Sequence, residues 1–528
     1  MKSLTHHDPD QFGHFRTREL PALLIILGIA TLLRCHLLGA VSLWYDEACS
    51  LRISQFPTSE MLDAISRDAH PPLYYYALKG WTICFGNATQ TVRLLSVLFG
   101  VSTTAASWWL VRELSTPKFN HPFQRRDGVA PLLAALLVAI NPLHIELSQE
   151  ARPYTMGTFF AVLAATFLVR ANRKDSSHKI PVRPSTWIAF GVCTAALSMT
   201  HYYGLWSVGA MFLFAAGVAT QRGAWRGLMA SIAVIGISWA PWWQTFLFQH
   251  TRAVDQLWFP PLTTNSLLET VFQALAGGKH SGLIEILIPV LFFSWFAIGI
   301  FFLCSRETSD PLIGLCIISP LLTVILYCVL IRNILGVRYL IFAQTFVLIA
   351  IAILIGRINK RQFQIAVLVS VVAWNGYWCL ELTKSRLDAA KFPGGMSAAN
   401  YINEQVVDAA PCIASSPFVF TLLAPHVEAK KNFIVEYRRE HRDDLLSGPS
   451  IQQKDFFRTD SILQTEKPSK IWAVDVVGLF GKSVRVKLPS DYQISSEARF
   501  PERYGYRIDY VIREYRLIEE QLPARSFP

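Results

Sequence analysis

The chain has 528 residues, of which 52% are hydrophobic and only 16% are charged, and its mean hydropathy is +0.32. Soluble domains carry roughly 25% charged residues, so this composition excludes an ordinary soluble protein and indicates a membrane protein. The net charge is +11, but the residues from Ser385 onward contain 20 Lys and Arg against 19 Asp and Glu. The positive excess therefore lies in the apolar part of the chain, where it is a topology signal and not a nucleic-acid-binding patch.

Hydropathy predicts about eleven membrane spans, or up to about thirteen, because the apolar tracts are long enough to cross a hydrocarbon core about 30 Å thick. No small-residue cleavage site follows the first tract, so we expect a retained span and not a signal peptide. The expected spans are 20–39, 90–111, 129–147, 153–170, 186–200, 203–220, 227–247, 282–304, 311–331, 338–356 and 364–382.

Basic residues recur in every second loop, as the positive-inside rule requires of cytoplasmic loops. Residues 1–19 are therefore expected in the cytoplasm, residues 20–384 in the membrane domain, and residues 385–528 outside a bacterial inner membrane; an endoplasmic-reticulum equivalent stays open. The basic residues are Lys2, Arg16, Arg18, Arg112, Lys118, Arg125, Arg126, Arg170, Arg173, Lys174, Lys179, Arg183, Arg222, Arg226, Arg306, Arg357, Lys360 and Arg361.

Two outer segments, 40–89 and 248–281, are long. The first contains PPLYYYALKGWTICFG, which is rich in aromatic residues and too short to span easily, so it predicts an interfacial or re-entrant helix. After residue 385 the pattern changes: PGG breaks the chain, SAANYINEQV predicts a short helix, and CIASSPFVFTLL, IWAVDVVGLF and YGYRIDYVIREYRL predict strands. The tail is therefore expected to be a small extracytoplasmic α/β domain that acts as a lid or docks the acceptor.

Polar and aromatic side chains gather at the predicted outer ends of the spans, where charged groups are costly and therefore candidates for function. Each has an ordinary explanation as well, such as an ion pair at a helix end, an interfacial aromatic belt or a snorkelling anchor. If each residue had only its own structural role, there would be no reason for all of them to lie on the same side of the membrane. Their occurrence in five loops on the predicted outer side therefore favours a functional site. The residues are Asp46 and Glu47 in LWYDEACS, His70 in RDAHPPLYYY, Glu150, Arg152 and Tyr154 in LSQEARPYTMG, His201, Tyr202 and Tyr203 in MTHYYG, and Arg332, Arg338 and Tyr339 in IRNILGVRYL.

Carboxylates and a histidine that face arginines fit the transfer of a sugar from a phosphorylated lipid. One carboxylate can take the proton of an acceptor hydroxyl, and an anion also stabilises an oxocarbenium-like transition state. Arginine side chains can bind the oxygens of the departing lipid phosphate. This chemistry needs no covalent nucleophile, so inversion at the anomeric carbon is expected.

The motifs WYDEACS, DAHPPLYYYALKGWTICFG and RLLSVLFGV, followed by SQEARPY, HYYG and VRYL, resemble the GT-C superfamily of polyprenyl-phosphate-sugar-dependent glycosyltransferases. Within it the chain is most similar to family 39 and to protein O-mannosyltransferase-like bacterial proteins, which are related to the lipid A aminoarabinose transferase. The resemblance covers roughly residues 20–380, so it implies a GT-C fold for the membrane domain and does not extend to the tail.

The resemblance also implies residue roles. Asp46 would be the catalytic base, Glu47 its partner in acceptor or metal contact, and Arg338 the ligand of the carrier phosphate. No cofactor is certain, because some members of the family need a divalent cation and others do not, and a lone Asp-Glu pair is not a sufficient ligand set. The other expected substrate-binding residues are His70, Glu150, Arg152, Tyr154, His201, Tyr202 and Tyr339.

The predicted function is a membrane glycosyltransferase that moves a sugar from a polyprenyl-phosphate carrier to a hydroxyl of a lipid, glycan or protein acceptor. The contacts typical of aminoarabinose transferases are not recognisable, so lipid A specificity is not implied. A flippase or transporter for a lipid-linked sugar remains an alternative, although internal repeats are absent and mid-span titratable groups are few beyond Arg34 and Glu285. A non-catalytic membrane anchor for the tail is the third interpretation.

Overall fold

The computed structural model describes residues 10–115, 128–172, 184–256, 260–277, 287–406, 410–428, 431–436, 449–452, 455–457, 467–479 and 481–518. The chain divides into two compact units. The helical unit comprises residues 1–36, 70–74 and 93–382, and the mixed unit comprises residues 37–69, 75–92 and 383–528. Most of the first expected outer segment is therefore grouped with the C-terminal tail.

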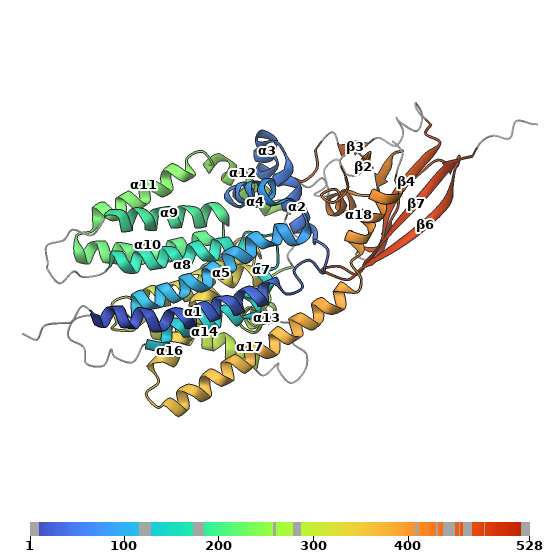
Figure 1. The fold of residues 1–528 in the computed structure, drawn as a ribbon. Helices are drawn as coiled ribbons and strands as arrows, with labels where there is room; N and C mark the ends of the chain where they lie inside the picture. Colours follow the sequence, from blue (N-terminus) through green and yellow to red (C-terminus); the bar gives the residue numbers. More distant parts are fainter. Residues whose placement is uncertain are drawn as a thin grey trace, which may run out of the picture. The chain divides into compact units, whose positions relative to one another are not determined.

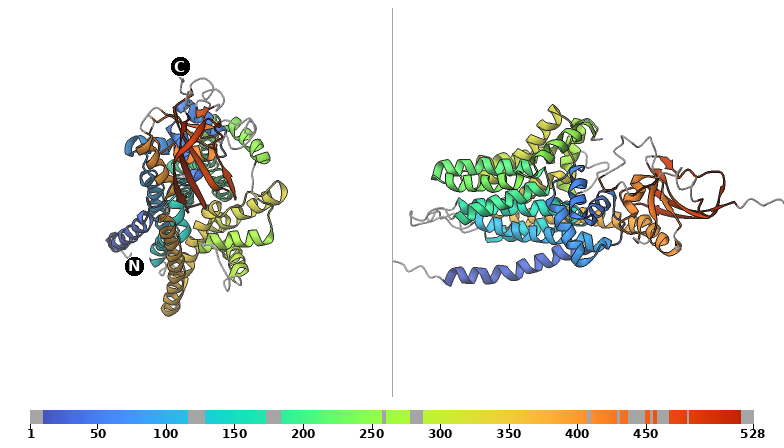
Figure 2. Two further views of the ribbon diagram at one scale, coloured as in Figure 1. Left: turned by 90° about the vertical axis from the view of Figure 1, so that its right-hand side faces the viewer. Right: turned by 90° about the horizontal axis from the view of Figure 1, so that it is seen from above.

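The helical unit consists of apolar helices, most of which lie side by side (Figures 1 and 2). Its elements are α1 (Asp10–Cys35), α5 (Thr89–Leu114, which begins in the mixed unit), α6 (Ala130–Ile140), α7 (Pro142–Ser148), α8 (Tyr154–Ala171), α9 (Pro184–Thr200), α10 (Gly204–Arg222), α11 (Trp225–Trp239), α12 (Trp243–Gln256), α13 (Thr264–Ala276), α14 (Leu287–Leu303), α15 (Asp310–Leu330), η3 (Val337–Leu340), α16 (Ile341–Arg357) and α17 (Arg361–Ala390, which ends in the mixed unit).

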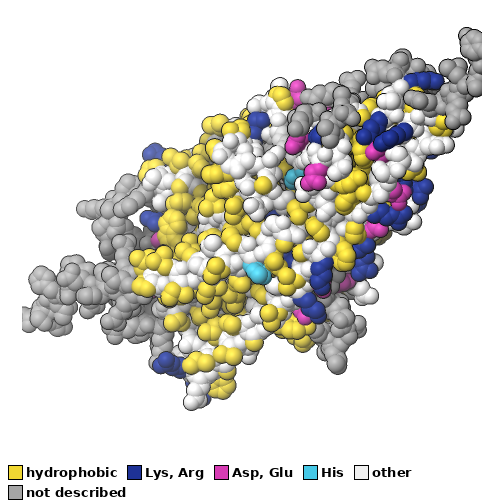
Figure 3. Space-filling model, turned by 45° about the vertical axis from the view of Figure 1, so that its right-hand side comes forward, with side chains coloured by type: hydrophobic (Ala, Val, Ile, Leu, Met, Phe, Trp, Pro, Cys, Tyr) yellow, Lys and Arg dark blue, Asp and Glu magenta, His cyan; other side chains and the backbone are white. Residues whose placement is uncertain are grey.

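The expected polytopic helical fold is confirmed, since each predicted span coincides with a helix or with a pair of helices. Among the described residues, 6 helices are long and apolar enough to cross a membrane, or up to 7 if the bent pair α6–α7 is one span. Two shorter apolar helices, α11 and α14, fall at further predicted spans. Large apolar side chains such as Leu32, Phe293 and Leu380 are exposed on these helices, which suits contact with lipid. Hydrophobic side chains cover much of the helical surface in Figure 3.

One predicted span is broken. Helices α6 and α7 meet at an angle of 58°. Pro142 cannot donate a backbone hydrogen bond, and the side chain of Asn141 starts the second helix by accepting the backbone N–H of the third residue after it, 3.2 Å away. The fully buried guanidinium of Arg34 donates to the carbonyls of Val138, at 3.0 Å, and Ala139, at 2.8 Å. The mid-span charge seen in the sequence therefore satisfies the carbonyls that the break exposes.

A second set of hydrogen bonds joins the residue after α7 to the end of α1. The amide Nε2 of Gln149, directly after α7, donates to the carbonyls of Leu33, Arg34 and His36 at 3.3, 3.1 and 2.8 Å. The end of α6 is thus capped by a side chain of α1, and the end of α1 is capped by the side chain of the residue that follows α7. The other mid-span candidate, Glu285, lies outside the described residues, as do Lys2, Lys118, Arg125, Arg126, Arg173, Lys174, Lys179 and Arg183.

The mixed unit combines short helices with one sheet, so the expected α/β character of the tail is confirmed. The strand order is β3-β2-β1-β4-β7-β6, with β5 beside β4; β3, β2, β1 and β4 pair in parallel, whereas β7 and β6 complete the sheet with antiparallel pairing. The elements are α2 (Tyr45–Gln55), α3 (Thr58–Ser66), most of α4 (Leu73–Phe85), α18 (Gly394–Gln405), β1 (Cys412–Ala414), α19 (Pro417–Leu423), β2 (Phe433–Glu436), β3 (Phe456–Phe457), β4 (Lys470–Leu479), β5 (Lys482–Val484), β6 (Tyr492–Glu502) and β7 (Ile508–Leu517).

The prediction of one strand over CIASSPFVFTLL was wrong for its second half. Strand β1 ends at Ala414, and the residues after it form the short helix α19. Ser416 caps this helix, since its hydroxyl oxygen accepts the N–H of Val419 at 3.4 Å, and Pro417 occupies the first helical position. A serine followed by a proline is a helix-start signal, which here outweighs the β propensity of the apolar residues behind it.

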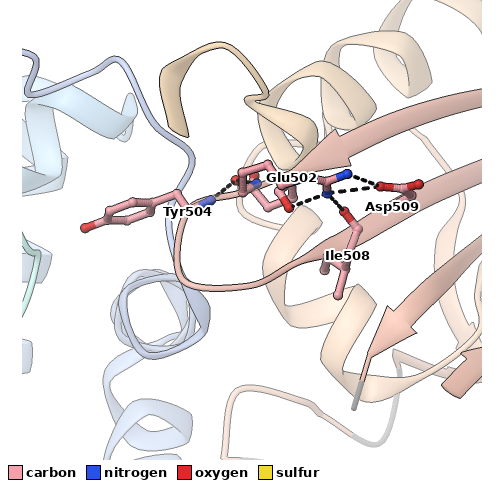
Figure 4. Close-up of polar contacts among 5 residues, drawn as sticks. Glu502, Tyr504, Ile508 and Asp509 are labelled. Carbon is pink, nitrogen blue, oxygen red and sulfur yellow. Dashed lines mark hydrogen bonds and ion pairs between the residues drawn. The ribbon is translucent and has the colours of Figure 1, made fainter. Parts of the chain in front are cut away.

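The turn between β6 and β7 is held by a compact polar network (Figure 4). The carboxylate of Glu502 accepts the backbone N–H of Arg503 at 2.9 Å and that of Gly395 at 3.0 Å, which ties the start of α18 to the end of β6. Arg503 in turn forms an ion pair with Asp509 at 3.1 Å. The PGG break predicted from the sequence therefore coincides with an anchored helix start.

Candidate functional site

The structure brings several of the expected site residues together at one end of the helical unit. They come from the turns that join α7 to α8 and α9 to α10, from η3, and from the segment that leads into α4. These residues are His70, Glu150, Arg152, Tyr154, His201, Tyr202, Arg338 and Tyr339. The two expected catalytic residues, Asp46 and Glu47, lie on α2 in the mixed unit.

His201 stands at the centre of this cluster and is buried. The centroid of its ring lies 5.2 Å from that of His70, 5.5 Å from that of Tyr154 and 5.4 Å from that of Tyr339. These rings come from loops that are far apart in the sequence. Ring contacts at these distances contribute attraction beyond simple burial and restrict how each side chain can turn.

Two arginines flank the rings. The Nη2 of Arg152 lies 3.1 Å from Nε2 of His70; since a guanidinium only donates, this histidine nitrogen is the acceptor. The guanidinium carbon of Arg338 lies 5.9 Å from the ring centroid of Tyr154, within the range of a cation–π contact. Glu150 is buried in the same turn as Arg152. The cluster therefore combines fixed positive charge with aromatic walls.

The hydrogen bonding of His201 defines its tautomer. Its Nδ1 accepts the backbone N–H of Tyr203 at 3.1 Å. Burial holds the pKa of His201 well below its usual value, and the nearby guanidinium charges of Arg152 and Arg338 lower it further. The ring is therefore neutral at physiological pH and carries its proton on Nε2.

The resulting Nε2–H donor is buried and has no hydrogen-bond partner among the described residues, and the same holds for the hydroxyl of Tyr154. A buried donor without a partner is costly, so such groups require an explanation. Next to two guanidinium groups, they suit an oxygen-rich anion. The cluster can therefore bind a phosphate by charge-assisted and neutral hydrogen bonds together.

Two residues of this region were missed or underused by the sequence analysis. Tyr203 stacks on Tyr339 with centroids 4.3 Å apart, and its place in HYYG was a usable signal. Gln249, which is buried in α12, donates to the carbonyl of His70 at 3.4 Å and accepts from the hydroxyl of Tyr202. Nothing in the local sequence marks this glutamine, because its partners lie about 50 to 180 residues away.

The carboxylates of Asp46 and Glu47 have different environments. Glu47 is fully buried, and its Oε2 accepts the backbone N–H of Trp44 at 3.3 Å, which caps the start of α2. Asp46 is half-buried in the first turn of the same helix, where the helix dipole favours a negative charge. Asp46 is therefore the better placed of the two to meet a substrate. Among the described residues, no group of three or more His, Cys, Asp and Glu is arranged to hold a metal ion.

Comparison with known proteins identifies the fold. Residues 69–243 match a family model described as dolichyl-phosphate-mannose-protein mannosyltransferase, and this stretch includes His70, Arg152 and His201. The structure is similar to that of ArnT from Cupriavidus metallidurans bound to undecaprenyl phosphate, with a TM-score of 0.58 and 14% identity over 93% of this chain and 97% of that chain. The chain has the same fold as ArnT, the GT-C fold.

The GT-C resemblance inferred from the sequence motifs is thus confirmed. ArnT from Cupriavidus metallidurans in the apo state gives the same TM-score of 0.58 at 14% identity, over 94% of this chain and 98% of that chain. The archaeal oligosaccharyltransferase AglB from Archaeoglobus fulgidus, in complex with an inhibitory peptide and a dolichol-phosphate, matches at a TM-score of 0.49 and 12% identity, over 89% of this chain and 75% of that chain. No protein in a search of curated sequences matches the chain.

Proposed function

We propose that this GT-C chain is a membrane glycosyltransferase that transfers a sugar from a polyprenyl-phosphate carrier to a hydroxyl of a lipid, glycan or protein acceptor. The observation that carries the proposal is the cluster of two arginines and a neutral, donating histidine at the end of apolar helices. A polyprenyl phosphate has a tail that suits lipid and a head that suits such a cluster. The shared fold with ArnT, which was solved with undecaprenyl phosphate, supports the same carrier class.

In this proposal the carrier phosphate is bound by Arg338 and Arg152, and His201 donates from Nε2. Charge-assisted hydrogen bonds to the phosphate oxygens stabilise the negative charge that grows there as the sugar departs. The His201 ring adds a directed donor without adding charge, because it stays neutral. Tyr154 and Tyr339 form the walls that hold the histidine ring in place.

Asp46 is the proposed general base. It takes the proton of the acceptor hydroxyl while the hydroxyl oxygen forms a bond to the anomeric carbon of the sugar. The bond between that carbon and the phosphate oxygen breaks, and the lipid phosphate leaves with the electron pair. Attack from the face opposite the leaving group inverts the anomeric centre. Glu47 supports this step by capping α2 and thereby fixing the turn that carries Asp46.

We further propose that the N-terminus is cytoplasmic, and that Asp46 and the tail face the outside of a bacterial inner membrane. The basis is the alternation of basic loops along the sequence, which includes Arg357, Lys360 and Arg361 where α16 ends and α17 begins. A carrier loaded with sugar would then be used on the outer face.

The decisive experiment is sugar transfer by the purified protein from a panel of radiolabelled polyprenyl-phosphate sugars, with wild type, Asp46→Asn and Asp63→Asn compared. Asp63 is a matched control, because it is an exposed carboxylate on α3 in the same outer segment. Transfer by wild type and by the control, with loss in Asp46→Asn at unchanged folding, is expected. Binding of the lipid without transfer in all three proteins would instead favour a flippase.

A further inference from the structure

We propose that the C-terminal segment from Thr383 onward is the support that positions the Asp46 helix, with Phe418 and Asp455 as its positioning residues. This inference rests on the proposed function, in which Asp46 is the base. It gives the tail a role in addition to the expected one of a lid or an acceptor-docking module. All of the contacts that carry it lie inside the mixed unit.

The outer segment that contains α2 is tied to the tail on both sides of that helix. Before α2, the hydroxyl of Ser42 accepts the backbone N–H of Met396, at the start of α18, at 3.1 Å. After α4, the side chain of Asn87 donates to the carbonyl of Pro425 at 3.4 Å. In each hydrogen bond the two partners are more than 300 residues apart in sequence. The two hydrogen bonds attach the outer segment to the tail near both of its ends.

The first turn of α2 rests on α19. The ring of Tyr45, next to Asp46, stacks on that of Phe418 with centroids 5.3 Å apart and planes 7° apart. Phe418 is itself held edge-on by Tyr506, which lies in the turn before β7, at 5.1 Å. The residue that precedes the proposed base is therefore fixed by two aromatic residues of the tail.

The last turn of α2 is fixed by an ion pair. The Nη2 of Arg52 lies 3.1 and 3.2 Å from the two carboxylate oxygens of Asp455, which also accepts the backbone N–H of Gln452 at 2.9 Å. Both side chains of the pair are largely buried, at 20% and 10% exposure, so water screens them less than at an open surface. The guanidinium of Arg52 also lies 5.8 Å from the ring centroid of Phe420 in α19.

These two contacts hold the two ends of α2 against the tail. The helix has only 11 residues, and an isolated helix of this length is marginal in water. Fixing one end through Tyr45 and the other through Arg52 sets both the position of the helix axis and its rotation. Because general-base catalysis needs hydrogen-bond reach, a small displacement of Asp46 costs rate more than it costs substrate binding.

The test compares Asp455→Asn and Phe418→Ala with wild type in steady-state transfer, normalised to folded protein. We expect kcat to fall by about tenfold to a hundredfold, while KM for the donor stays within about twofold of the wild-type value, since the proposed phosphate-binding residues Arg152, His201 and Arg338 lie in the other unit. The matched control is Asp509→Asn, which breaks the ion pair with Arg503 in the same domain (Figure 4) and should leave kcat unchanged.

A charge swap gives the second readout. In Arg52→Asp combined with Asp455→Arg, the ion pair is restored with reversed sign, and kcat should recover to above that of either single variant. This arm remains informative even if Phe418→Ala does not fold. Recovery supports positioning, whereas losses that add independently would overturn it.

The outcomes separate this inference from the proposed function. Absence of transfer by wild type from every donor tested would contradict the glycosyltransferase itself. Transfer by wild type that is lost in Asp46→Asn but kept at full kcat in Asp455→Asn and Phe418→Ala would overturn only the supporting role of the tail.

Discussion

In the cluster of rings and arginines around His201, ionisation and folding are coupled through that histidine. Its imidazole is buried beside positively charged neighbours, so protonation in the folded state is unfavourable. An unfolded chain would bind that proton near pH 6.5. Stability from this group is therefore fully present above about pH 6.5 and is lost as the pH falls below it, at no more than about 1.4 kcal/mol per pH unit.

We accordingly expect the thermal unfolding midpoint of wild type in detergent to fall more steeply between pH 6.5 and about pH 5 than that of His201→Gln. The comparison of slopes removes the contribution of groups that titrate equally in both proteins. Parallel slopes would show that His201 is not the group responsible.

A second prediction concerns the phosphate. Loss of a charged hydrogen bond in Arg338→Gln is expected to raise the Kd for the sugar-free polyprenyl phosphate by about tenfold to a hundredfold. Arg361→Gln removes an exposed arginine at the start of α17 and should bind the lipid as wild type does. Equal affinity of the two variants, measured by a direct binding titration, would exclude Arg338 as a phosphate ligand.

At the level of helices, the broken span α6–α7 depends on side chains from outside it. Arg34 donates to Ser148 at 3.1 Å as well as to the carbonyls at the break, and Cys379 donates to the carbonyl of Ile140, also at 3.1 Å. In lipid no water can replace such donors. The break is thus a fixed bend, and it leads directly into the turn that carries Glu150 and Arg152.

Replacing Arg34 by Met should therefore destabilise the protein by about 2 kcal/mol or more, because buried carbonyls lose their donor. Gln149→Ala should destabilise it as well, and the double variant by less than the sum, since both side chains hold the same helix junction. Leu32→Ala is the control on the same helix, where the side chain is exposed. Thermal unfolding in detergent compares these four variants with wild type.

The sequence predicted these helices well because hydropathy reports directly on membrane burial. It did not predict the bend at Asn141 as a break within one span, although an Asn-Pro pair is a known helix-start signal. It also missed the helix after Ser416, where the local start signal competed with an apolar run. Around His201, loop positions predicted that Arg152, Arg338 and His201 would lie at one site, and the structure brings them together, whereas Gln249 was not predicted because only tertiary contacts reveal it.

On the scale of the whole molecule, the unexpected feature is a unit assembled from two distant pieces of chain. Composition and periodicity predicted an α/β tail, but they could not show that residues 37–69 and 75–92 belong with it. Ion pairs such as that of Arg52 with Asp455 join residues too far apart in sequence to be predicted from local sequence patterns. The sequence therefore predicted the individual elements but not which of them pack into the same unit.

The proposed orientation is testable on the same scale. In a background without the nine native cysteines, Ser495→Cys on β6 should react with a membrane-impermeant maleimide applied to intact cells. Lys360→Cys, between α16 and α17, should react only after the membrane is opened. The reverse pattern would invert the topology, and reaction of both in intact cells would contradict α17 as a membrane span.

Because the mixed unit is assembled from two distant pieces of chain, its first piece is synthesised well before its second. Arg52 is made 403 residues before Asp455, which is about 20 to 80 s of synthesis at roughly 5–20 residues per second. In the proposed orientation, α2 leaves the ribosome and crosses the membrane during that interval, before the strands and helices that later hold it are made. A chain that stops before its last quarter would insert its spans and yet never order the proposed base. Catalysis would thus begin only after synthesis of the polypeptide is complete.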